Sequence, residues 1–61
     1  MTPKEFRQAR DRFGKTIRIG DSIHTFRYGV GKIIGFNDYG DIIVKFGKHT
    51  VSLMPERVSK I

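Results

Sequence analysis

The stretch "GDSIHTFRYGVGKIIGF", residues 20–36, decides between two interpretations of the chain, because it places four glycines among isoleucines and aromatic residues. Glycines in such a run either cradle a ligand or form the corners at which short strands bend. Gly20, Gly29, Gly31 and Gly35 have the spacing expected of corners in a strongly bent antiparallel sheet. The stretch therefore favours an architectural role for its glycines.

The residues that follow alternate between apolar and polar positions, which is typical of half-buried strands. Ile42, Val44 and Phe46 alternate with Ile43 and Lys45, and Val51 and Leu53 alternate with Thr50, Ser52 and Met54. Gly40 and the Gly47-Lys48 pair predict tight turns between these runs, and Pro55 ends the last of them. "PER" predicts a single tight turn before "VSKI" returns as a final strand. We therefore expect one mainly β domain over residues 1–61, in which residues 17–61 form a barrel of four to five antiparallel strands.

The first residues carry signals for one N-terminal α-helix, expected over residues 3–13. Thr2 can cap it, Pro3 suits its first position and Glu5 can complete a capping box. Phe6, Ala9 and Phe13 recur at helical spacing, and Gly14 supplies the end. Arg7 and Arg10 lie on the polar side of this helix, either as a solvated face or as an arm that contacts phosphate.

Composition restricts the class of protein. The chain has 61 residues, no cysteine and a formal net charge of +6, which excludes disulfides and thiolate metal sites. The sequence shows no signal-peptide pattern and no apolar run long enough to cross a bilayer, so we expect a cytoplasmic protein with no membrane partner. A basic excess in so small a domain favours a polyanionic partner, although net charge also serves solubility alone.

The patterns that suggest catalysis are weak. "ARDRFGKT", residues 9–16, fits a loose phosphate-loop pattern, but a phosphate loop follows a strand and opens a helix, whereas here a helix is expected to precede it. His24 and His49 have no carboxylate at a recognisable metal-binding spacing and are expected to be surface strand residues. We therefore expect no enzymatic activity, no cofactor and no small-molecule substrate.

Residues 20–33, "GDSIHTFRYGVGKI", resemble the opening of the Tudor-like, SH3-like barrels of bacterial transcription proteins. The resemblance is to the RNA-polymerase-interacting domain of CarD and of the transcription-repair coupling factor, and to the C-terminal module of UvrD/PcrA-type helicases. It rests on Gly20, Asp21, Ile23, Tyr28, Gly29, Gly31 and Ile33, and loosely on the closing "LMPERVSKI". Thr25 stands where those families often have histidine, and the expected helix is not shared. The resemblance implies an SH3-like barrel.

The resemblance to those families implies a strand edge that pairs with RNA polymerase. Other SH3-like barrels instead bind nucleic acid through basic strands and aromatic residues. The candidate binding residues are Arg27, Tyr28, Lys32, Tyr39, Lys45 and Lys48, together with Arg7 and Arg10. For Tyr28 and Phe26 the alternative is a plug in the end of the barrel, while Phe36 and Phe46 are expected in the core.

The resulting hypothesis is a non-enzymatic module that associates with nucleic acid, either DNA or RNA, or with RNA polymerase or another transcription or repair protein. The alternative is a protein–protein adaptor, or a small regulator from a mobile element, that binds through an edge strand. A third hypothesis follows from a faint similarity of "TVSLMP", residues 50–55, to a strand of type II dihydrofolate reductases, which are also small SH3-like barrels.

Overall fold

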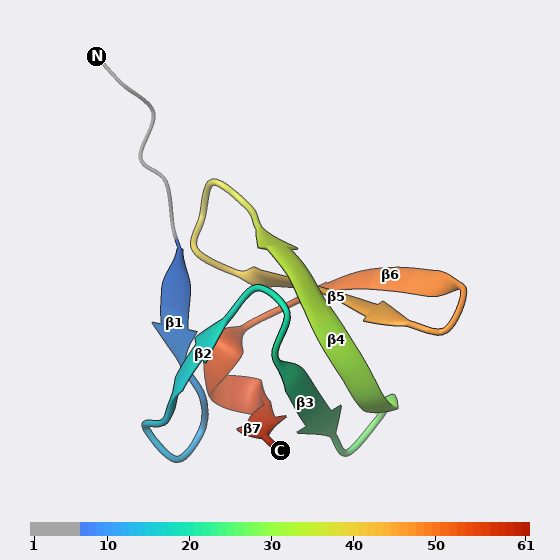
Figure 1. The fold of residues 1–61 in the computed structure, drawn as a ribbon, viewed down its shortest axis with the longest axis horizontal. Coiled ribbons are helices and arrows are strands. Elements are labelled where there is room, and N and C mark those ends of the chain that lie inside the picture. Colours follow the sequence, from blue (N-terminus) through green and yellow to red (C-terminus); the bar gives the residue numbers. More distant parts are fainter. Residues whose placement is uncertain (1–6) are drawn as a thin grey trace.

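The computed structural model describes residues 7–61 and shows a mainly β protein, as the alternation predicts (Figure 1). Its strands are β1 (Gln8–Arg10), β2 (Thr16–Arg18), β3 (Ser22–Thr25), β4 (Gly29–Phe36), β5 (Ile42–Phe46), β6 (His49–Leu53) and β7 (Ser59–Lys60). A short 3-10 turn, η1 (Pro55–Arg57), separates the last two strands, where "PER" predicted a tight turn. Within these residues no helix is long and apolar enough to span a bilayer.

The strands form two antiparallel sheets instead of the expected closed barrel. One is five-stranded in the order β6-β5-β4-β3-β7, and the other is the β1–β2 hairpin. A bulge between Ile33 and Gly35 bends β4. Closure would require the two edge strands β6 and β7 to pair, and within residues 7–61 they do not; β7 has only two residues and pairs with β3. Residues 7–61 therefore form a bent open sheet, and the prediction of a closed barrel is wrong.

The predicted N-terminal helix is also wrong over its described part. Residues 8–10 form β1, and a turn at residues 11–14 leads into β2. The Asp11 carboxylate accepts hydrogen bonds from the Phe13 and Lys15 backbone N–H groups, which is how aspartate competes with helix formation. Phe13 is exposed, whereas the helical stripe placed it on the apolar face. Residues 3–6 of the predicted helix lie outside the part of the chain that the structure describes.

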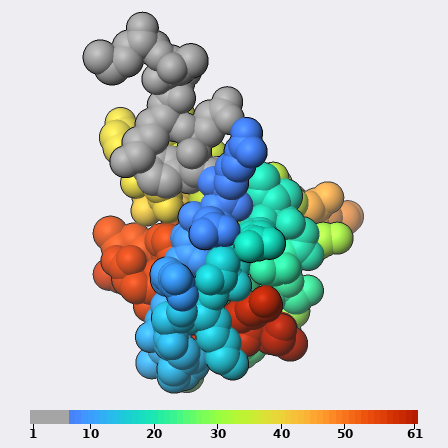
Figure 2. Space-filling model, turned by 60° about the vertical axis from the view of Figure 1, so that its left-hand side comes forward, coloured from blue at the N-terminus to red at the C-terminus, as the bar shows by residue number. Residues whose placement is uncertain are grey.

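The core lies between the inner face of the large sheet and the β1–β2 hairpin. Its fully buried side chains are Ile17, Ile23, Ile33, Ile42, Val44 and Val58. Ile17 comes from β2, so the hairpin covers the sheet on this side. Figure 2 shows the hairpin, in blue to cyan, between the η1 segment in orange-red and the chain end in dark red. On the opposite, outer face of the sheet the side chains of Ser22, His24, Lys32, Lys45 and Thr50 are exposed.

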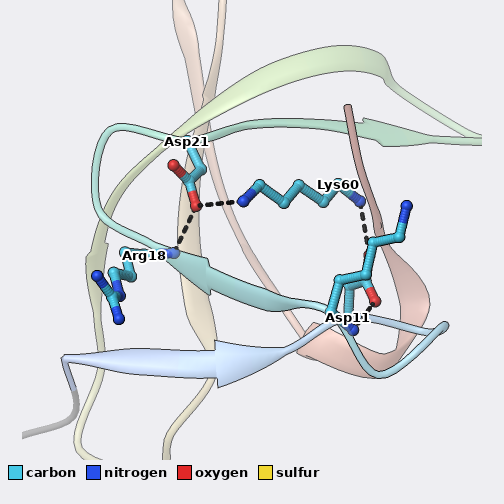
Figure 3. Close-up of polar contacts among 5 residues, drawn as sticks. Asp11, Arg18, Asp21 and Lys60 are labelled. Carbon is cyan, nitrogen blue, oxygen red and sulfur yellow. Dashed lines mark hydrogen bonds and ion pairs between the residues drawn. The ribbon is translucent and has the colours of Figure 1, made fainter.

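Asp11 fastens the hairpin to the end of the chain. It is 4% exposed, and its Oδ2 accepts a hydrogen bond of 2.7 Å from the Lys60 backbone N–H (Figure 3). The Lys60 ammonium group lies 3.9 Å from Asp21 Oδ2, which also accepts the Arg18 backbone N–H at 2.9 Å. The bond from Lys60, with those from Lys15 and Phe13, lowers the pKa of Asp11 against the opposing effect of burial.

Candidate nucleic-acid interface

Two lysines lie directly opposite each other on the outer face of the sheet. Lys32 of β4 is paired with Lys45 of β5, and the same row continues to Ser22 of β3 and Thr50 of β6. Residues opposite each other in an antiparallel ladder share one face of the sheet. All four side chains are exposed, and we call this set (Ser22, Lys32, Lys45 and Thr50) the lysine row.

The lysine row has no acidic counterpart. Within residues 7–61 neither Lys32 nor Lys45 forms an ion pair. The sequence contains no Asp or Glu over residues 22–37 or 42–55, which supply all of β3 to β6. Like charges directly opposite each other destabilise a sheet, so an anion bound between them would relieve a repulsion present in the protein alone.

The bulge in β4 is what brings the two lysines together. Phe36 pairs with Ile42, and without a bulge this register would place Lys32 opposite Phe46. Beyond the bulge the register shifts by one residue, so Lys32 faces Lys45 while Ile33 stays in the core opposite Val44. The pairing of charges is thus a product of the same irregularity that bends the sheet.

The β3–β4 turn carries a second cluster, made of aromatic side chains. Thr25 Oγ1 accepts the Tyr28 backbone N–H at 2.8 Å, and Gly29 adopts a φ of 79° at the end of the turn. This turn leaves Phe26 fully exposed and Tyr28 42% exposed. The Arg27 guanidinium carbon lies 5.6 Å from the centre of the Tyr28 ring, within the range of a cation–π contact.

Gly31 leaves room for the ring of Phe46, which contacts Tyr28. The rings of Tyr28 and Phe46 lie 5.2 Å apart between centres. A Cβ at Gly31 would meet Phe46 Cε1 at 2.5 Å and Val44 Cγ1 at 2.7 Å, so the Phe46 ring packs where a side chain would stand. The absence of a side chain at Gly31 thus seats Phe46, and Phe46 in turn holds Tyr28.

A groove lies between this turn and the edge strand β6. It has a volume of about 670 Å³ and is open to solvent. Its lining, here called the Tyr28 groove, consists of Arg27, Tyr28, Val30, Phe46, Gly47, His49, Thr50 and Val51. A smaller hollow of about 230 Å³ adjoins it and shares Arg27 and Tyr28, with Phe26 and Arg57 also in its wall. Among residues 7–61, no acidic side chain lines either hollow.

The structure separates the predicted binding residues into groups. Arg27, Tyr28, Lys32 and Lys45 belong to the groove or the lysine row, and Lys48 lies in the β5–β6 turn between groove residues Gly47 and His49. Tyr39 is 89% exposed in the loop at the opposite end of β4. Arg10 donates a hydrogen bond of 3.0 Å to the Gly14 carbonyl in the other sheet, and Arg7 directly precedes β1.

Sequence reasoning did not name Phe46 or His49 among the site residues, and for Phe26 it left open a plug in the end of the barrel, which the full exposure of the ring excludes. Phe46 was expected in the core; it is half-buried and packs against the core, and it also forms a wall of the groove. The signal that could have found them is the Gly47-Lys48 turn, which pairs Phe46 with His49 at the end of the hairpin. Phe26 stands beside Arg27 in the turn, where its ring has no core to enter.

The arrangement can attract anions and can offer aromatic faces to a flat ring. Within residues 7–61, no group of three or more His, Cys, Asp or Glu side chains is placed to hold a metal ion. Comparisons of the chain with protein-family models, curated proteins and solved structures find no match.

Proposed function

We propose that the protein is a non-enzymatic module that binds nucleic acid, DNA or RNA, through the outer face of its large sheet. The observation that carries the proposal is the opposed pair Lys32–Lys45, which has no acidic partner among the described residues. Phosphates of a nucleic-acid backbone supply the counter-charge, and the hydroxyls of Ser22 and Thr50 at the ends of the row can donate hydrogen bonds to phosphate oxygens. Contacts of this kind are independent of base sequence.

A salt titration tests this proposal. Binding of a fluorescein-labelled 12-bp duplex is measured by anisotropy between about 50 and 200 mM salt. Replacing Lys32 and Lys45 by glutamine should weaken binding and make the slope of log K against log salt shallower by about 1.8, because each lost phosphate contact contributes about 0.9.

The matched control is Lys15→Gln with Arg18→Gln, which removes the same charge from the β1–β2 hairpin on the other side of the core. This variant should keep most of the wild-type slope. Equal losses in the two variants would show that net charge alone attracts the nucleic acid, and no binding by the wild type at about 50 mM salt would contradict the proposal.

A second candidate function rests on the edge strand β6, which pairs with β5 on one side only. Such an edge can accept a strand of another protein, and the resemblance of residues 20–33 to polymerase-interacting domains favours a transcription or repair protein in that role. A pull-down from lysate with and without nuclease separates the two candidates. A partner that survives nuclease treatment and does not depend on Lys32 and Lys45 favours the adaptor.

A further inference from the structure

The β3–β4 turn, at one end of the large sheet, exposes two aromatic side chains, Phe26 and Tyr28. Phe26 is fully exposed, and the fully buried apolar side chains of residues 7–61 are all aliphatic. Beside it Tyr28 keeps 42% of its surface accessible, and its ring rests on Phe46. A phenylalanine and a tyrosine displayed at one turn are costly to leave in water, so they mark a surface that meets another molecule.

The Tyr28 groove has the size of a small-ligand site. Its volume of about 670 Å³ falls inside the range of about 300–1,000 Å³ typical of such sites. The turn that carries Tyr28 forms one wall, and the start of β6, from His49 to Val51, forms another. In Figure 1 the β3–β4 and β5–β6 turns both lie toward the right-hand side of the view.

The charge around the groove selects the kind of occupant. Arg27 lines both hollows and Arg57 lines the smaller one, while Lys48 occupies the adjacent turn. The part of the chain that the structure describes contributes no acidic side chain to either lining. An occupant that is flat and carries negative charge on both sides matches these walls, because aromatic faces bind the flat part and cations bind the charges.

We infer that the Tyr28 groove receives an unpaired nucleobase, so that the protein prefers single-stranded nucleic acid to duplex. The inference rests on the proposed function, since the lysine row supplies the general attraction to phosphate. In a duplex the bases are stacked and paired, so their faces cannot reach Tyr28 or Phe26. A single strand can place one base against Tyr28 with its flanking phosphates near Arg27 and Lys48.

Paired titrations with single and double strands test the inference. A labelled 12-nucleotide oligothymidylate and the 12-bp duplex are titrated with wild type and with Tyr28→Leu. Tyr28→Leu should weaken single-strand binding about 10-fold or more, the loss expected for one base–aromatic contact, and change duplex binding less than about twofold.

Phe26→Ala is the second variant, because removing a fully exposed ring leaves the fold intact even if Tyr28→Leu is unstable. It should weaken single-strand binding selectively by about 5-fold. Tyr39→Leu is the control, since Tyr39 is similarly exposed but lies at the far end of β4, and it should change neither affinity.

Tyrosine fluorescence gives a readout of the contact itself. The chain has two tyrosines and no tryptophan, so in Tyr39→Phe the emission comes from Tyr28 alone. An unlabelled oligothymidylate should quench this emission as a base stacks on the ring. Inorganic polyphosphate, which has the charge without the bases, should leave it unchanged.

The outcomes separate this inference from the proposed function. Equal affinity for the two nucleic acids, equal loss of both in Tyr28→Leu and Phe26→Ala, or quenching by polyphosphate would each overturn the groove as a base site while leaving the lysine row intact. Loss of both affinities only in the Lys32 and Lys45 variant, with no effect of either aromatic variant, also overturns it. If the wild type binds neither nucleic acid, the proposed function fails first.

Discussion

Gly31→Ala tests whether close packing of Phe46 on the β4 backbone holds this end of the sheet together. The φ of Gly31 is not in the left-handed region, so alanine can adopt the backbone conformation without strain. Its Cβ would nevertheless stand 2.5 Å from Phe46 Cε1 and 2.7 Å from Val44 Cγ1, well inside contact distance. The Phe46 ring must therefore move, and the Tyr28 ring that rests on it must follow.

The expected loss of stability follows from two opposing terms. Overpacking of this kind costs about 1–3 kcal/mol, and replacing glycine by alanine returns about 0.4–1 kcal/mol by restricting the unfolded chain. The net loss lies between about 0 and 2.6 kcal/mol. Its midpoint of about 1.3 kcal/mol lowers the melting temperature of a domain of this size by about 5–10 °C. A domain of 61 residues has little stability to spare, so Gly31→Val should show no cooperative unfolding transition.

Gly35→Ala is the matched control on the same strand. Its Cβ would meet only Ile43 Cδ1, at 3.9 Å, which is ordinary van der Waals contact. This variant should be as stable as the wild type or more stable by about 0.4–1 kcal/mol. Thermal and urea unfolding of both variants provide the measurement. Equal melting temperatures for Gly31→Ala and Gly35→Ala would refute the packing argument.

Three further predictions concern charge and turn geometry. The lowered pKa of Asp11 stabilises the fold fully above the ordinary value of 3.8, and this stabilisation is lost as the pH falls below that value. Between pH 2 and 5 the free energy of unfolding should therefore fall more steeply for the wild type than for Asp11→Asn. Asp11→Asn should also melt lower at neutral pH, because its single side-chain oxygen cannot accept from Lys60 and from the turn N–H groups of Phe13 and Lys15 together. An unchanged melting temperature would contradict this. Lys32→Gln should raise the free energy of unfolding by about 0.2–1 kcal/mol at low salt, with a smaller gain at high salt, and a loss of stability would refute the repulsion. Gly47→Ala should cost about 1–2 kcal/mol in denaturant unfolding, since Gly47 has a φ of 60°, and a neutral result would show that the turn rearranges.

The strands after residue 20 could be predicted because their signals are local. Alternation identified which of Ile42 to Phe46 face the core, and the structure buries Ile42 and Val44 while exposing Lys45. The Gly47-Lys48 pair predicted a two-residue turn, and Phe46 and His49 pair across it. Gly40 has the expected positive φ. In each of these cases the residues that determine the structure are neighbours in sequence.

The helix over residues 3–13 was wrong in its described part because the deciding contact is remote. Ala9 and Phe13 fit a helical spacing, but Asp11 is bound by the backbone of Lys60, 49 residues away. That bond, together with the local turn at Phe13 and Lys15, turns the chain back as a hairpin whose Ile17 enters the core. The local turn at Asp11 is compatible with the sequence, but the bond to Lys60 cannot be inferred from neighbouring residues, and tertiary context overrides helix propensity here.

The binding residues were predicted singly, whereas their arrangement depends on register. Lys32 and Lys45 both lie on strands that alternation identified, but their opposition requires the one-residue shift of the bulge between Ile33 and Gly35. Sequence favours a glycine at such a point without fixing where the shift occurs. The same limit hid the groove, because Tyr28 meets Phe46 only when the two turns fold to one side.

The glycines of residues 20–36 need not be assigned to either architecture or a ligand site alone. Gly31 is buried, and the space that its side chain would fill is occupied by the ring of Phe46. Phe46 then supports Tyr28, and the bulge before Gly35 sets Lys32 against Lys45. A substitution at Gly31 should therefore damage stability and single-strand binding together, whereas Phe26→Ala should damage binding alone. Full single-strand affinity in a folded but destabilised Gly31→Ala protein would show that packing at Gly31 does not position the Tyr28 groove.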